Sequence, residues 1–128
     1  MTLPIRDIEV ELPKPANDVP LIIMVGPNEE LRVQRAVFSA VGVRFLGFRH
    51  GDTALLALLT SPASAIMVST PADMPADHLI AEMVSQGEVA PIIRLGEDHG
   101  MSLPQSPAAA RSLLVRVGVL NRRLRTLS

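Results

Sequence analysis

The residue types that most often perform chemistry are scarce in this sequence. It contains no cysteine, which excludes disulfides, thiolate nucleophiles and cysteine-bound zinc or iron–sulfur sites. Its three histidines, His50, His78 and His99, are scattered over a turn, a helix start and a loop, and no two have the spacing of metal ligands. Of twelve basic residues only Lys14 is a lysine, which excludes a lysine-dependent mechanism elsewhere in the chain.

Two short polar segments have suitable residue types for ligand binding but an unsuitable arrangement. The segment 26–28 precedes a predicted helix, where phosphate often binds, but one glycine is a poor phosphate loop and Glu29 and Glu30 would repel an anion. The polar run 97–99 has adjacent side chains, which splay apart, and turn chemistry explains it better than a cation does. No Ser–His–Asp arrangement is supported by these spacings. We therefore expect no enzyme, no metal site and no cofactor.

The composition indicates one globular domain. The chain has 128 residues, 48% hydrophobic and 20% charged, which is enough to bury a single core. Its net charge of −1 provides no basic surface for nucleic acid or an anionic membrane, and three phenylalanines are too few to stack bases. Charges from Arg6 onward interrupt any signal peptide, and the apolar runs are too short to span a membrane. We expect a cytoplasmic protein.

Short buried strands and amphipathic helices alternate along the chain from Leu21 onward. Residues 1–20 contain four prolines and are interpreted as an N-terminal arm, with a short strand at 5–10. Asn28 is the expected N-cap of the first helix and Gly42 its expected end. The pattern predicts an α/β fold with a parallel sheet and helices on both faces. The predicted strands are 21–25, 43–48, 65–68, 91–95 and 101–103, and the predicted helices are 29–41, 53–59, 76–86 and 107–127.

This order of elements resembles the receiver domain of two-component response regulators, which has a CheY-like (flavodoxin-like) doubly wound sheet of five parallel strands. The resemblance covers residues 20–120. It rests on Met74-Pro75 after the third strand, on the run Ala-Pro-Ile-Ile at 90–93, and on Leu-Leu-x-Arg-Val at 113–117. It implies an arm at 1–20, a receiver-like domain at 21–120 and a helical linker that starts at 121–128.

The positions that carry phosphorylation chemistry in this family have other residues here. A receiver has an acidic pair that holds Mg²⁺, a phosphoacceptor aspartate, a hydroxyl residue after the fourth strand and a lysine after the fifth. The corresponding positions in this chain are Gly26, Pro27, Ser69, Gly96 and Gln105. Other gap placements put the acceptor at Thr70 or Pro71. The resemblance thus implies a degenerate receiver, or pseudo-receiver. Asp73 could be a displaced acceptor, but we favour a solvated or helix-capping aspartate.

The connection between the fourth and fifth predicted strands is unusually short. Only residues 96–100 are available, whereas a parallel crossover needs about a dozen residues. The helix that a receiver has there is therefore expected to be missing or reduced to a turn. The loss would expose a sheet flank that must be covered by the arm, a neighbouring domain or a second chain. Its candidate residues are Ile92, Leu95, Met101 and Leu103.

The predicted final helix carries an apolar seam and several arginines. Leu113, Val117, Leu120, Leu124 and Leu127 follow a heptad pattern, and the last three are expected to extend the interaction surface. The end of the chain resembles the linker between receivers and output domains in PleD-like regulators. Arg116, Arg122 and Arg123 could bind an anion, but we favour a solvated helix face with its positive charges near the helix C-terminus.

These observations favour a non-catalytic, phosphorylation-independent signalling module. We expect it to mediate protein–protein interaction or dimerisation in a bacterial two-component or second-messenger pathway. Its partner would be another signalling protein, its own downstream domain or a second copy, and neither nucleic acid nor a membrane. The main alternative is a sensor that binds a cyclic dinucleotide through the C-terminal arginines. A phosphotransfer receiver with an unusual acceptor is a third hypothesis.

Overall fold

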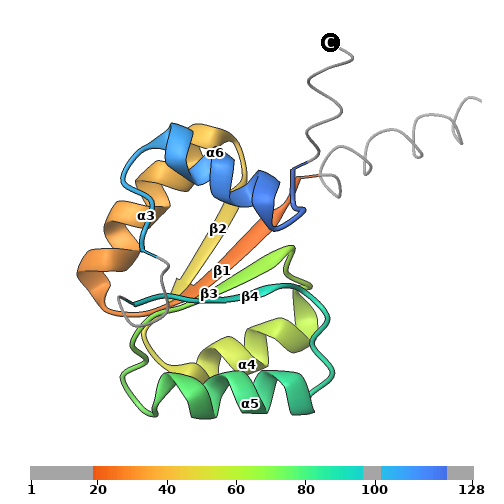
Figure 1. Ribbon diagram of the computed structural model, residues 1–128. Coiled ribbons are helices and arrows are strands. Elements are labelled where there is room, and N and C mark those ends of the chain that lie inside the picture. Colours follow the sequence, from red (N-terminus) through yellow and green to blue (C-terminus); the bar gives the residue numbers. More distant parts are fainter. Residues whose placement is uncertain (1–18, 97–101, 121–128) are drawn as a thin grey trace, which may run out of the picture.

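The computed structural model describes residues 19–96 and 102–120, whose strands form one parallel sheet (Figure 1). The order across the sheet is β2-β1-β3-β4, so β1 pairs with β2 on one side and with β3 on the other. Each strand lies within one residue of its predicted bounds. The strands are β1 (Leu21–Val25), β2 (Arg44–Phe48), β3 (Ala65–Val68) and β4 (Ile92–Arg94).

The two central strands are buried on both faces. Every residue of β1 and of β3 is buried. Because side chains alternate along a strand, Ile22 and Met24 join the core on one face of the sheet, and Ile23 and Val25 join the core on the other. A continuous apolar run such as Leu-Ile-Ile-Met-Val is typical of a strand that helices cover on both sides.

Two helices cover each face of the sheet (Figure 1). One pair is α3 (Asn28–Val41) and α6 (Pro107–Arg116), which pack against each other, and the second pair is α4 (Gly51–Thr60) and α5 (Ala76–Ser85). This is the predicted doubly wound α/β arrangement. No helix in the described ranges has the length and apolar character needed to cross a lipid bilayer.

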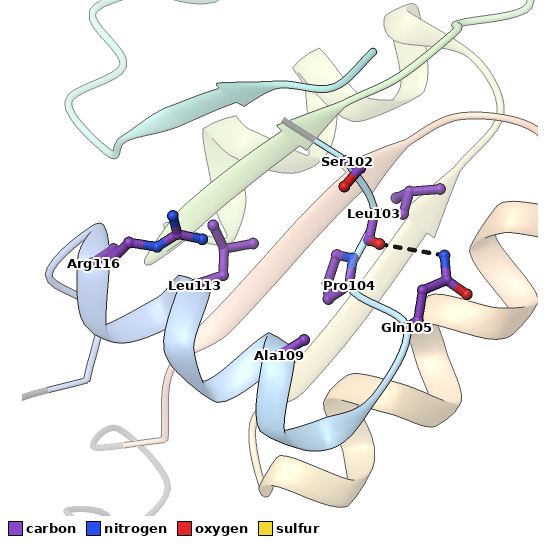
Figure 2. A pocket seen from close by; sticks show the side chains of 7 residues that line it. All are labelled: Ser102, Leu103, Pro104, Gln105, Ala109, Leu113 and Arg116. Atoms are coloured by element: carbon purple, nitrogen blue, oxygen red, sulfur yellow. Dashed lines mark hydrogen bonds between the residues drawn. The ribbon is translucent and has the colours of Figure 1, made fainter. Parts of the chain in front are cut away.

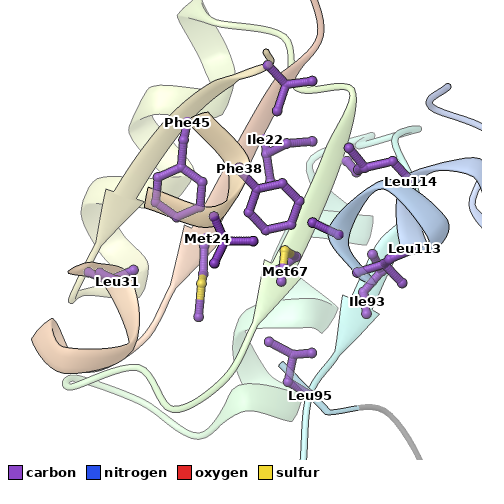
Figure 3. Close-up of a cluster of buried hydrophobic side chains, with 14 residues drawn as sticks. Ile22, Met24, Leu31, Phe38, Phe45, Met67, Ile93, Leu95, Leu113 and Leu114 are labelled. Carbon is purple, nitrogen blue, oxygen red and sulfur yellow. The ribbon is translucent and has the colours of Figure 1, made fainter. Parts of the chain in front are cut away.

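The core beneath α3 and α6 is built around two phenylalanines (Figure 3). Phe38 of α3 and Phe45 of β2 stack with ring centroids 5.8 Å apart and an interplanar angle of 14°. Both rings are buried, and the Arg35 guanidinium lies 5.4 Å from the centroid of the Phe45 ring. Two of the three aromatic side chains in the sequence are therefore occupied in packing.

The prediction of one continuous helix over 107–127 is wrong, because α6 ends at Arg116 and residues 117–120 are not helical. Gly118 has a left-handed φ of 86°. Its amide donates to the Val115 carbonyl at 3.1 Å, and the Val119 amide donates to the Leu114 carbonyl at 2.9 Å. These two bonds make the Schellman motif that ends many helices at a glycine.

The early end of α6 also breaks the predicted heptad seam. Leu113 is buried in the core, whereas Val117 and Leu120 follow the helix and pack against the same core as partly buried side chains. Leu124 and Leu127 lie outside the described residues. The apolar spacing from Leu113 to Leu120 therefore reflects packing against one core, by residues in α6 and by residues that follow it.

Two smaller predictions also need correction. Asn28 is the first residue of α3 and not its cap, because Pro27 occupies the N-cap position in an extended conformation. The fifth strand expected at 101–103 is absent from its described part, since neither Ser102 nor Leu103 is in a strand. The described residues between β4 and α6 contain no helix, and residues 97–100, where the helix was predicted to be lost, lie outside the described ranges.

Candidate functional site

The carboxyl ends of β1 and β3 lie side by side at the topological switch point, where the strand order changes direction. Open α/β sheets bind ligands at this point. Gly26 follows β1 and Ser69 follows β3, and the Ser69 amide donates to the Val25 carbonyl at 2.9 Å. A Cβ atom at Gly26 would lie only 3.1 Å from the Ser69 Cβ. The structure therefore brings two of the predicted site positions, Gly26 and Ser69, into contact. It leaves little room for a side chain at Gly26.

The Ser69 hydroxyl has a carboxylate partner that the sequence analysis missed. It donates to Glu30 Oε1 at an oxygen–oxygen distance of 2.6 Å. This is the short range typical of a hydroxyl that bonds to an ionised carboxylate. The side chain at the predicted acceptor position is thus already engaged from within the chain.

Pro27 explains why Glu30 is free to reach Ser69. Glu30 is the third residue of α3 after the cap, and a glutamate there commonly bonds back to the backbone amide of the cap residue. Pro27 has no amide hydrogen, so this capping box cannot close. The pattern Pro-x-x-Glu at a helix start was the sequence signal that could have indicated a longer-range partner for Glu30.

A pocket of about 350 Å³ lies beside this contact. It is lined by Gly26, Pro27, Asn28, Glu29, Arg49, Thr70, Pro71 and Ala72. Glu29 and Arg49 give it one charge of each sign, so it has no overall preference for an anion or a cation. Within 19–96 and 102–120, no three histidine or carboxylate side chains come close enough to share a metal ion.

Asp73 caps a helix, which is the interpretation favoured by the sequence. Its Oδ1 accepts a hydrogen bond from the Gly51 amide at 2.7 Å, and its Oδ2 accepts one from the Asp52 amide at 3.2 Å. These amides open α4, whose own N-cap residue, His50, provides no side-chain cap. The bond from Gly51 is the main reason why the pKa of the exposed Asp73 carboxyl lies below its usual value.

The remaining two predicted positions do not join the contact between Gly26 and Ser69. Gly96 follows β4 and is exposed. Gln105 precedes α6 and donates to the Leu103 carbonyl at 3.3 Å. Gln105 lines a second pocket, of about 320 Å³, whose walls are residues 102–105 and the side chains of Ala109, Leu113 and Arg116 on α6 (Figure 2).

A buried glutamine holds the segment before α6 in place. Gln34 of α3 is fully buried, and its Nε2 donates to the Pro104 carbonyl at 2.9 Å. Its Oε1 is buried without a hydrogen-bond partner among the described residues. The sequence analysis did not identify Gln34, because a polar residue within an amphipathic helix is usually solvated.

The predicted interaction residues have different environments. Leu95 is only 7% exposed and belongs to the core. Ile92, Leu103 and Leu120 are half-buried at the edge of the two cores, and Arg116 is exposed. The residues outside the described ranges are Met101, Arg122, Arg123, Leu124 and Leu127.

Comparison with solved structures establishes the fold class. The receiver domain (CheY-like) of a response regulator from Methylobacillus flagellatus matches with a TM-score of 0.66 and 13% sequence identity, over 77% of this chain and 98% of that chain. The fold is CheY-like. No protein-family profile and no curated protein sequence matches the chain. In this CheY-like chain, the contact between Ser69 and Glu30 lies at the carboxyl edge of the central strands, where the resemblance places the acceptor.

Proposed function

We propose that this chain is a pseudo-receiver, a non-catalytic signalling module that acts by binding protein and does not depend on phosphorylation. The observation that carries the proposal is the hydrogen bond between Ser69 and Glu30 at the end of β3. In a CheY-like fold this position is the one expected to accept a phosphoryl group. Here it has a hydroxyl, which cannot form an acyl phosphate, and that hydroxyl faces a carboxylate.

The surroundings of Ser69 also disfavour phosphorylation. A phosphoryl group on this residue would lie against the Glu30 carboxylate, and two like charges at hydrogen-bond distance repel each other. Magnesium requires several hard oxygen ligands, and the side chains of Gly26 and Pro27 provide none. Because Gly26 lies so close to Ser69, a side chain with a carboxylate could replace Gly26 only if the loop shifted.

Binding of a protein partner is the activity that the remaining surface supports. Large apolar side chains are exposed on the helices beneath the sheet, with Leu56, Leu59 and Val84 all more than 60% exposed. We propose that the partner is another signalling protein, a domain that follows 121–128 or a second copy of the chain in a bacterial cytoplasm. The half-buried Ile92, together with Leu103 and Leu120, would contribute from the edges of the cores.

Intact mass after incubation with acetyl phosphate and Mg²⁺ tests the proposal. We expect no phosphoryl adduct on this chain, while an active receiver in the same mixture becomes labelled. A stable adduct on the chain would overturn the proposal, and peptide mapping would show whether Ser69 or Asp73 carries it.

Light scattering over a range of concentrations tests the homodimeric form of the proposal. The full chain is compared with a version that ends at Gly118, two residues beyond the end of α6 at Arg116. A dimer that persists in the shorter version places the interface on the domain, and a dimer lost with residues 119–128 places it on the tail. A monomer at every concentration would contradict homodimerisation and leave a different protein as the partner.

One observation favours the alternative of a cyclic-dinucleotide sensor. Arg116 lines the pocket beside α6 together with Ser102 and Gln105, a polar set that suits a phosphate. The lining has no aromatic side chain to stack a base, so we regard this function as the weaker of the two. Calorimetry with common cyclic dinucleotides would support it by saturable heat that Arg116→Ala abolishes.

A further inference from the structure

An apolar strip lies open along the flank of α5 that faces β4. Asp77, Ile80 and Val84 are spaced three and four apart and therefore share one stripe of the helix. The Asp77 carboxylate forms an ion pair with the Arg94 guanidinium, which places this stripe on the side of β4. Val84 is 61% exposed, and Ile80 and Ile92 are only half-buried.

The outer edge of β4 is unpaired among the described residues. β4 is the last strand in the sheet order, and its residues Ile92–Arg94 pair with β3 alone, while Gly96 beyond it is in a single β-bridge. The Leu95 amide donates to the Val68 carbonyl of β3 at 2.9 Å, so the neighbouring Arg94 amide points to the outer edge. An edge strand with an apolar flank is normally covered in a stable protein.

The opposite face of the same edge is hollowed and carries one arginine. The pocket of about 320 Å³ between residues 102–105 and α6 opens there, with Arg116 in its lining (Figure 2). Arg116 lies in the last turn of α6 and forms no ion pair with a described carboxylate. A strand that fits this edge should therefore be apolar on its α5 side and acidic on its α6 side.

We propose that residues 7–12 of the same chain add to the outer edge of β4 as an antiparallel strand. This segment reads Asp-Ile-Glu-Val-Glu-Leu, a strict alternation of acidic and aliphatic residues. The aliphatic residues Ile8, Val10 and Leu12 cover the strip on α5, and the acidic residues face the side of Arg116. Main-chain hydrogen bonds to β4 supply the remaining binding energy.

The length of the connection permits this arrangement. Residues 13–19 can span up to about 25 Å when extended. The position next to β4 lies three strand spacings from β1, or about 14 Å away. Because the connection joins the amino end of β1, the added strand must finish at that end of the sheet, which makes it antiparallel to β4. The protein partner proposed above would then compete with this segment wherever it binds the same flank.

Pairs of introduced cysteines test the proposal in the full chain, which has no cysteine of its own. Val10→Cys is combined with Val84→Cys on the strip, or with Leu56→Cys on α4. Leu56 is a matched control, because its exposure of 65% is close to the 61% of Val84. A third pair, Glu9→Cys with Val84→Cys, tests which side of the segment faces α5. Disulfide formation under mild oxidation is followed by non-reducing electrophoresis and by intact mass after alkylation.

We expect an intramolecular disulfide between positions 10 and 84 in at least several-fold higher yield than in either control pair. Equal yields in the three variants would overturn the proposal. A disulfide that joins two chains would also overturn it, because the occupant would then be a second copy.

Hydrogen exchange provides an independent measurement without cysteines. The Arg94 amide should exchange at least tenfold more slowly in the wild type than in the Val10→Asp variant, whereas Thr2→Asp should leave its rate unchanged. Equal exchange in all three proteins would contradict the added strand. Phosphorylation is measured separately, so this inference and the proposed function can fail independently.

Discussion

Gln34 on the buried side of α3 donates from Nε2 to the Pro104 carbonyl, 70 positions later in the chain, at a distance of 2.9 Å. Pro104 directly follows the fifth strand that the sequence predicted at 101–103. A side-chain hydrogen bond from a helix therefore anchors this segment where strand pairing was expected. The bond connects α3 to the chain that enters α6, the two helices that cover one face of the sheet.

Replacement of Gln34 should distinguish its hydrogen bond from its volume. Gln34→Ala leaves the Pro104 carbonyl unpaired and opens a cavity, so we expect it to lower the free energy of unfolding by about 2–4 kcal/mol. Gln34→Met fills the same space and removes the unpartnered Oε1, so it should cost only about 1 kcal/mol. Urea unfolding measures both values. Equal losses for the two variants would show that the packing of this side chain is not important for stability.

A double-mutant cycle should detect direct coupling between Ser69 and Glu30. Each of Ser69→Ala and Glu30→Ala removes one partner of the 2.6 Å hydrogen bond, and we expect a coupling energy of about 1 kcal/mol in urea unfolding. The control cycle combines Ser69→Ala with Glu29→Ala in place of Glu30→Ala. The exposed Glu29 should show no coupling to Ser69. Additive losses in the first cycle would contradict a stabilising bond.

The Asp73 cap should make part of the stability depend on pH. The pKa of this carboxyl is lowered in the folded chain, so its stabilising effect is complete above the unfolded value of about 3.9 and is lost as pH falls through the folded value. Asp73→Asn should therefore be less stable than the wild type at pH 7, and the difference should shrink below about pH 4. Chemical unfolding from pH 7 to pH 2.5 measures this difference. A constant difference over that range would argue against the cap, and Asp52→Asn serves as the neighbouring control.

Gly118→Ala should distinguish a helix α6 that ends at Arg116 from a helix that continues through Gly118. A φ of 86° is strained for alanine, so the substitution should lower the free energy of unfolding by about 1–2 kcal/mol. Gly87, with a φ of 93° after α5, is a matched control that should respond similarly. In a continuous helix over 107–127 the same substitution would instead raise both stability and helical circular dichroism. An increase in either quantity would contradict the helix end at Arg116.

The sequence by itself determined the α/β class and most element positions. The strand at Leu21–Val25 and the helix end at Gly42 were predictable because burial on both faces demands an unbroken apolar run, and because glycine adopts a left-handed conformation without strain. The capping role of Asp73 could also be favoured, since a loop aspartate near a helix start commonly accepts backbone amides.

Only the tertiary structure decided which residues meet across long separations. The bond between Glu30 and Ser69 and the burial of Gln34 depend on how α3 lies over the sheet, which no local pattern specifies. The heptad spacing from Leu113 to Leu120 was misleading for the same reason. An apolar period records which residues face a core, but a single glycine with two backbone hydrogen bonds decides whether the helix continues along that face or ends.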